Sequence, residues 1–132
     1  MYLHISSKLP ISDVQKAFSN TFPYLKIEFF KNQGIHHLLP GDRSIAEAQQ
    51  KIREGSIEIS GDMKVRELEQ ALDALFPLHA QVFRRSGNIW LETTMTDDWT
   101  LAHQNEHGRE ISAPDKKKNT IRDDYDLSRN DD

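Results

Sequence analysis

The chain has 132 residues, a formal net charge of −4 at pH 7 and no cysteine. This length gives room for one domain with one hydrophobic core. The acidic balance argues against a general polyanion binder, and the lack of cysteine excludes disulfides, thiolate metal sites and cysteine nucleophiles. No apolar run of about 18 residues and no basic region followed by an apolar stretch occur, so we expect a cytoplasmic protein without a membrane span.

Residues 2–31 predict a strand, a helix and a second strand. Apolar residues alternate with polar ones in both strands, as they do in half-buried strands. These residues are Leu3 and Ile5 in the first strand and Leu25, Ile27 and Phe29 in the second. Between them, apolar residues recur at helical spacing at Ile11, Val14, Phe18 and Phe22. Ser12 and Gln15 are spaced as a capping box at the helix start, and Pro23 ends the helix.

Residues 56–93 predict the same order of elements, followed by a hairpin. Ile57 and Ile59 alternate with polar residues in the strand, and the helix carries an apolar stripe with Glu69 on its exposed side. The stripe consists of Val65, Leu68, Leu72 and Leu75, and Pro77 ends the helix. A Gly87-Asn88 turn then joins two apolar runs, the pattern of a β-hairpin.

The two units align at a constant offset of 54 residues, so that Phe22-Pro23 corresponds to Phe76-Pro77. We therefore predict two βαβ repeats, residues 2–31 and 56–85. After Pro77 the match weakens, because Ile27 then corresponds to Gln81, which suggests a shift of one residue in the fourth strand. The predicted fold class is α+β: a ferredoxin-like βαββαβ two-layer sandwich with an extra hairpin strand. A mixed sheet, in which the helix between the units also crosses over, is the alternative.

Two further helices are predicted outside the repeats. A short inserted helix begins at Ser44, where Glu47 completes a capping box, and ends at Gly55. A C-terminal helix is capped within residues 96–98 and ends at Gly108. Residues 109–132 are rich in charges of both signs and have scattered apolar residues, so we expect a folded domain over residues 1–108 and a disordered tail after it.

The pattern His103-x-x-Glu106-His107 is the one sequence motif that suggests a metal site. Two histidines four residues apart share a helix face, and the glutamate could act as general base on a zinc-bound water. Such a site needs a third protein ligand well downstream, yet only a short charged tail remains, so the pattern favours a solvated polar helix end. His36-His37 lies in a predicted surface loop, and the isolated glycines form no phosphate-binding loop. No cofactor is expected.

The basic and aromatic residues near the hairpin suggest a binding surface: Trp90, Arg85, Arg84 and Phe30. Ile89 and Leu91 are expected to face the helix of residues 65–75, which leaves Trp90 on the other face of the strand. Because Trp and Arg are enriched in protein interfaces, we favour a non-enzymatic domain that binds another protein. A small enzyme or a metal- or ligand-binding domain that uses the His103–His107 region is the first alternative, and binding of single-stranded nucleic acid is the second. The identity of the partner and the oligomeric state are left open by the sequence.

Overall fold

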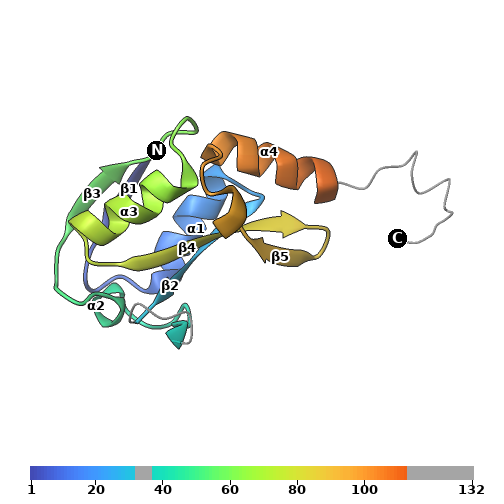
Figure 1. The fold of residues 1–132 in the computed structure, drawn as a ribbon. Helices are drawn as coiled ribbons and strands as arrows, with labels where there is room; N and C mark the ends of the chain where they lie inside the picture. The colour runs from blue at the N-terminus through green and yellow to red at the C-terminus, as the bar shows by residue number, and fades with distance from the viewer. Residues whose placement is uncertain (32–36, 113–132) are drawn as a thin grey trace, which may run out of the picture.

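The computed structural model describes residues 1–31 and 37–112, which form a mixed α+β domain (Figure 1). The first half contains β1 (Tyr2–Ile5), α1 (Ile11–Thr21), β2 (Leu25–Phe30) and α2 (Ile45–Ala48). The second half contains β3 (Gly55–Glu58), α3 (Val65–Leu75), β4 (His79–Ser86), β5 (Ile89–Glu92) and α4 (Leu101–Ser112). In these two described ranges, no helix has the length and apolar character needed to cross a membrane.

The strands form two antiparallel sheets, in which each strand of the first half pairs with its counterpart in the second half. β1 pairs with β3, and β2 pairs with β4, which also carries β5. The mixed α+β class is confirmed, but these strands do not form the single four-stranded sheet that the ferredoxin-like arrangement predicts. One reason is that helix side chains bond to the edge of β2 that faces away from β4, and to β4 just before the residues that pair with β5. Gln15 and Ser19 of α1 bond to carbonyl oxygens of β2, and Glu69 of α3 accepts from β4.

The offset of 54 residues holds in three dimensions. α1 and α3 begin and end at positions that differ by this offset, and Leu3 lies directly opposite Ile57 in the β1–β3 pair. The shift in the fourth strand is also found, because Ile27 of β2 lies opposite Val82 rather than Gln81. Directly opposite residues share a face, so the core-facing residues of β4 are displaced by one position from the repeat.

The repeat extends further than the sequence suggests, to the starts of α2 and α4. Reciprocal backbone hydrogen bonds join the start of α1 to that of α2: Ile11 N–H donates to Arg43 O, and Ile45 N–H donates to Leu9 O. The same pair of bonds joins α3 to α4: Val65 N–H donates to Trp99 O, and Leu101 N–H donates to Met63 O. We call these two arrangements the crossed helix starts. Each half thus contains a strand, a helix, a second strand and a second helix, and the start of its second helix is hydrogen-bonded to the start of its first.

The hydrophobic core lies between the helices and the inner faces of the two sheets. The predicted helix stripes supply much of it: Ile11, Val14, Phe18 and Phe22 in the first half, and Val65, Leu68 and Leu72 in the second. Leu75 is also predicted in this stripe, but it is 54% exposed. The next residue, Phe76 at the C-cap, is buried in the core cluster and takes the inward position at this end of α3.

Helix ends differ from the sequence predictions in four places. The capping box of Ser44 and Glu47 is confirmed, but α2 already ends at Ala48. Gln15 caps no helix start, because its side-chain amide reaches β2 instead. Thr100 Oγ1 accepts from His103 N–H in the first turn of α4, so the aspartates before it are not the cap. α4 continues through Gly108 to Ser112, and most of the predicted tail, residues 113–132, lies outside the described residues.

Candidate functional site

An open part of the β2–β4–β5 sheet carries two aromatic rings and two cations. In the strand register, Lys26 lies opposite Phe83, and Arg85 lies opposite Trp90, so that all four side chains share one face. The Lys26 ammonium lies 5.4 Å from the ring centre of Phe83 and 5.1 Å from that of Trp90, and the Arg85 guanidinium lies 5.5 Å from that of Trp90. We call these four residues the Trp90 surface.

The Trp90 surface lies outside the hydrophobic core. Phe83 and Trp90 are half-buried, yet neither belongs to the core cluster. α4 packs on the opposite face of the sheet, where the Cβ position of Gly108 would lie 3.1 Å from Arg84 Cγ. Cations within about 6 Å of an aromatic ring centre attract its face. Two such contacts, from Lys26 and Arg85, favour the orientation of the Trp90 ring that the structure shows.

Arg84 and Phe30, which the sequence grouped with Trp90, lie elsewhere. Arg84 points to the α4 side of the sheet, where it donates to Gln104 Oε1 at 2.9 Å and lies 6.0 Å from the ring centre of Trp99. Its role there is to join β4 to α4. Phe30 is on the outer face but at the far end of β2, and only 7% of it is exposed. The segment after β2 covers this end, since Leu38 forms a bridge with Phe30.

The expected orientation of Trp90 on β5 is found, but the expected contacts of its neighbours are not. Trp90 faces away from the helices, but Ile89 and Leu91 do not contact α3 as expected, being 55% and 37% exposed. The reason is that β5 is the outer strand of its sheet, beyond β4, and α3 packs beside β4. Ile89 and Leu91 therefore form an apolar strip on the α4 side of β5.

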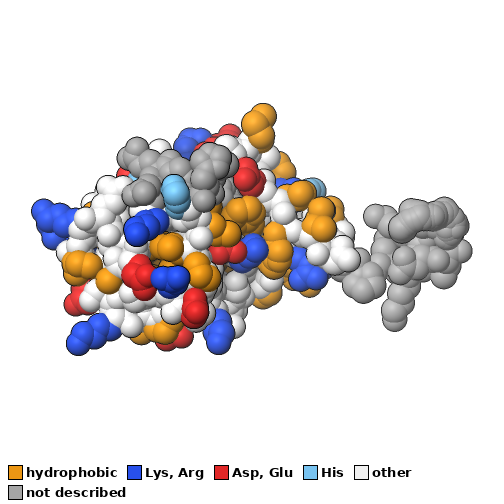
Figure 2. Space-filling view, turned by 90° about the horizontal axis from the view of Figure 1, so that it is seen from below, with side chains coloured by type: hydrophobic (Ala, Val, Ile, Leu, Met, Phe, Trp, Pro, Cys, Tyr) orange, Lys and Arg blue, Asp and Glu red, His pale blue; other side chains and the backbone are white. Residues whose placement is uncertain are grey.

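Charges of both signs lie near the Trp90 surface. Lys26 forms an ion pair with Glu28 at 3.0 Å, and Arg85 Nε donates to Gly87 O at 2.6 Å. Among the described residues, no carboxylate lies within ion-pair distance of Arg85. Figure 2, which views the molecule from below, shows hydrophobic side chains interspersed with both basic and acidic ones. This mixture differs from the continuous basic patch that nucleic-acid backbones require.

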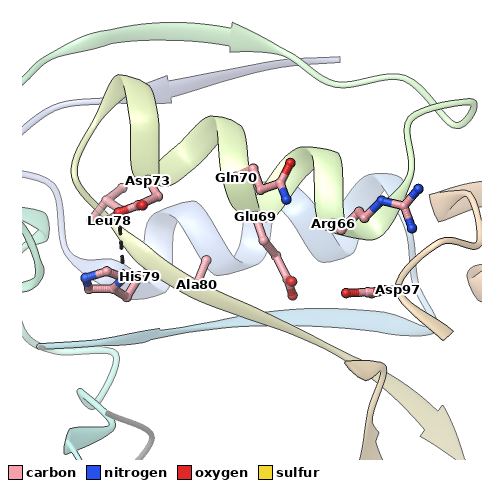
Figure 3. Close-up of a pocket in the computed structure, with 8 residues that line it drawn as sticks. All are labelled: Arg66, Glu69, Gln70, Asp73, Leu78, His79, Ala80 and Asp97. Carbon is pink, nitrogen blue, oxygen red and sulfur yellow. Dashed lines mark ion pairs between the residues drawn. The ribbon is translucent and has the colours of Figure 1, made fainter. Parts of the chain in front are cut away.

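A groove of about 260 Å³ lies between α3 and the start of β4. Figure 3 shows its lining: acidic groups at both ends, with Glu69 pointing toward Asp97 at one end and Asp73 beside His79 at the other. The His79 ring lies 3.7 Å from the Asp73 carboxylate. Arg66 flanks the end near Asp97.

Glu69, which was expected on the exposed side of its helix, is the most perturbed acid described. Burial, with a smaller contribution from the negative charge of Asp97, raises the pKa of Glu69 to about 7. A hydrogen bond accepted from Val82 N–H, at 2.9 Å, acts in the opposite direction. The perturbation alone does not make this a catalytic group, because buried structural acids are perturbed in the same way.

The repeat explains why Glu69 is present. Gln15 occupies the equivalent position of α1, and its amide bonds to Ile27 O, at the edge of β2. Glu69 covers the edge of β4 at Val82, the residue opposite Ile27. In the first half the matching space is closed, because Gly41 packs close to Ser12 and Gln15. We conclude that Glu69 has a structural role: it accepts a hydrogen bond from a backbone N–H of β4 that no neighbouring strand binds.

The two histidines of α4 stack on Trp99 and form no metal cluster. Their ring centres lie 4.3 Å (His103) and 5.6 Å (His107) from that of Trp99. A shallow surface hollow of about 290 Å³ is lined by His103, Glu106, His107 and Glu110. Glu106 is bound to Arg109. Within residues 1–31 and 37–112, no group of three or more His, Asp and Glu is arranged to hold a metal ion.

Comparison of this chain with protein-family models, with curated proteins and with solved structures finds no match in any of the three. The candidate site therefore depends on the geometry of the chain itself.

Proposed function

We propose that this protein is a non-catalytic domain that binds another protein, and that the Trp90 surface is the centre of the contact. The observation that carries the proposal is the position of the Trp90 ring. It lies outside the core, between the Lys26 and Arg85 cations, on the sheet face opposite α4.

The chemistry of the Trp90 surface matches that of interface hot spots. Trp and Arg are the residues whose truncation most often weakens protein complexes, and they act best when neighbouring contacts exclude water. A ring that is already held in place loses little conformational entropy when a partner covers it. Arg85 has no carboxylate partner among the described residues, so we expect the partner to present an acidic group beside an apolar one.

The alternatives have weaker support. Nucleic-acid binding is disfavoured by the net charge of −4 and by the carboxylate of Glu28, which is paired with Lys26 of the Trp90 surface. The α4 histidines would need a third ligand to form a catalytic zinc site.

Quantitative affinity purification from the source cells tests the proposal, with wild-type protein, Trp90→Ala and Met95→Ala compared side by side. Met95 is 94% exposed and is the matched control. A partner that uses the Trp90 surface should be recovered by wild type and Met95→Ala but lost with Trp90→Ala. With the purified partner, Trp90→Ala should weaken binding by about 2 kcal/mol or more, or roughly thirtyfold.

The unfolding free energy separates binding from folding. Because the Trp90 ring lies outside the core, Trp90→Ala should lower it by less than about 1.5 kcal/mol. A loss of several kcal/mol would assign Trp90 to the structure of the fold. Partners that bind all three proteins equally would place the binding surface elsewhere.

A further inference from the structure

The groove between α3 and β4 lies along a part of β4 that has a strand on one side alone. β2 pairs with the whole of β4, whereas β5 pairs with it only from Phe83 onward. In the part of the chain that the structure describes, the other edge of β4 over residues 79–82 therefore has no strand partner. The groove, of about 260 Å³, opens at this edge.

The peptide groups of Ala80 point into the groove. On a strand, alternate residues direct their N–H and C=O groups to the same edge. Val82 shows which residues face away from β2, because its N–H donates to Glu69 and its C=O accepts from Thr93 Oγ1 at 2.8 Å. Ala80 precedes Val82 by two residues and lines the groove (Figure 3). Within residues 1–31 and 37–112, no group donates to the Ala80 carbonyl.

The first half of the chain shows how the same kind of edge is closed. Two carbonyl groups of β2 point away from β4, and side chains of α1 donate to both. Ser19 Oγ donates to Leu25 O at 2.8 Å, and Gln15 Nε2 donates to Ile27 O at 2.9 Å. Both donors belong to the chain itself, so this edge of β2 needs no external group.

In the second half, acids replace both of these donors. Glu69 and Asp73 occupy the α3 positions that correspond, at the offset of 54, to the two donors of α1. With the one-residue shift of β4, Ala80 corresponds to Leu25. An ionised carboxylate accepts hydrogen bonds and donates none. The Ala80 carbonyl therefore lacks the donor that its counterpart in the first half has.

The charges around the groove have an acidic balance. Glu69, Asp73 and Asp97 face it, against Arg66 and His79. His79 lies 3.7 Å from Asp73 and is charged only when protonated. Arg66 takes part in none of the ion pairs found among the described residues. An occupant that complements this groove carries a positive charge and several hydrogen-bond donors.

We propose that the groove binds the side chain of an arginine from another protein. A guanidinium carries a positive charge and five N–H donors in a planar fork, so it can supply the missing donor at Ala80 and pair with Glu69 and Asp97. The groove is smaller than the roughly 300–1,000 Å³ of sites for drug-sized ligands, and this size suits one long side chain. Gln70, which is exposed at the groove, can bond to the peptide groups beside the arginine.

An NMR titration of the full-length protein with N-acetyl-arginine N-methylamide tests this assignment. The backbone amides of Glu69, Gln70 and Ala80 should shift in a saturable manner. The citrulline analogue, which has a similar shape and no charge, should bind about tenfold or more weakly, because it forms no charged hydrogen bond. Agmatine, which has the guanidinium but no peptide groups, should also bind more weakly, because nothing in it reaches Gln70.

Variants that copy the first half provide the matched comparison. Glu69→Gln combined with Asp73→Ser places on α3 the two side chains that close the edge of β2. This double variant should weaken binding of the arginine probe by about tenfold or more. Asp97→Asn, which leaves the β4 edge unchanged, should weaken it as well. Glu58→Gln removes a negative charge from an exposed position of β3 and should retain the wild-type affinity.

Equal shifts with the arginine and citrulline probes, or shifts that miss Ala80, would overturn the proposal. Agmatine binding as tight as that of the arginine probe would overturn the protein partner and assign the groove to a small cation. Unchanged affinity in both the double variant and Asp97→Asn would also overturn it. The groove and the Trp90 surface share no residue, and this titration uses no cellular partner, so its failure leaves the proposed function to its own test.

Discussion

We expect the native protein to lose stability between about pH 5 and 8, and replacing Glu69 by glutamine should remove this loss. Burial raises the pKa of Glu69 from 4.5 to about 7 in the folded state. Between these two values the folded protein binds a proton that the unfolded chain has released, so the free energy of unfolding falls as the pH rises. A glutamine at this position can still accept from Val82 N–H, the bond that Glu69 accepts at 2.9 Å, because its side-chain amide also carries a carbonyl oxygen.

The size of the effect follows from the shift. One pKa unit corresponds to 1.36 kcal/mol, so the raised pKa has an upper limit of about 3 kcal/mol. Glu69 borders an open groove, and solvent screening reduces this figure to about 1–2 kcal/mol. Glu69→Gln should thus be as stable as the wild type near pH 5 and about 1–2 kcal/mol more stable at pH 8.

Urea unfolding of both proteins at closely spaced pH values between 5 and 8 measures the difference. Glu58→Gln, on an exposed position of β3, is the control for removal of a negative charge and should show no such trend. Curves for wild type and Glu69→Gln that stay parallel over the whole range would refute the assignment of Glu69 as a buried acid. A variant less stable at every pH would show that the charge itself is needed at the β4 edge.

Two further predictions concern the core. Leu68→Ala should lower the unfolding free energy by about 2–5 kcal/mol, because Leu68 is fully buried, whereas Gln70→Ala should change it by less than about 0.5 kcal/mol; equal effects in urea unfolding would contradict the helix phase. Gly108→Ala should destabilise by about 1–2 kcal/mol although alanine favours helices, because its Cβ would lie 3.0 Å from Tyr24 Cβ and 3.1 Å from Arg84 Cγ. A rise in melting temperature would show that these neighbours can move.

Sequence periodicity predicted the parts of the fold that depend on burial within one element. α1 and α3 were located by apolar residues at helical spacing, and the offset of 54 between the halves follows from those stripes. The sheet order could not be predicted in this way, because the same alternation suits any strand partner. Gln15 and Glu69 bond to strand edges in the structure, but polar residues at those helix positions resemble ordinary exposed helix residues in the sequence.

The second part of the repeat had a signal in the sequence that was too weak to recognise. Residues 42–46 read Asp-Arg-Ser-Ile-Ala and residues 98–102 read Asp-Trp-Thr-Leu-Ala, so both segments have an Asp followed by an aliphatic-Ala pair, at an offset of 56. The offset changes from 54 to 56 because the second half has two more residues between the starts of its two helices, α3 and α4, than the first half has between the starts of α1 and α2. A search at one constant spacing therefore misses it.

The candidate site was predicted in part. Trp90 and Arg85 were chosen for their residue types, and the structure places them together with Lys26 and Phe83. Lys26 and Phe83 were missed as partners because they meet only through the β2–β4 pairing, which no local pattern reveals. The pairing of β2 with β4 brings Lys26, from the first half of the chain, beside Phe83, Arg85 and Trp90 from the second half.

That same pairing has a consequence for how the chain folds. β1 and β2 form their ladders with strands of the second half, so the first half finishes synthesis with both ladders unformed, apart from the bridge between Phe30 and Leu38. Its crossed helix start can close at once, because all of its bonds lie within the first half. Sheet formation must wait for β3 and β4, and such distant pairing slows folding. On the ribosome, the first half would present unpaired strand edges for as long as the second half takes to emerge, which makes this interval the period of greatest aggregation risk.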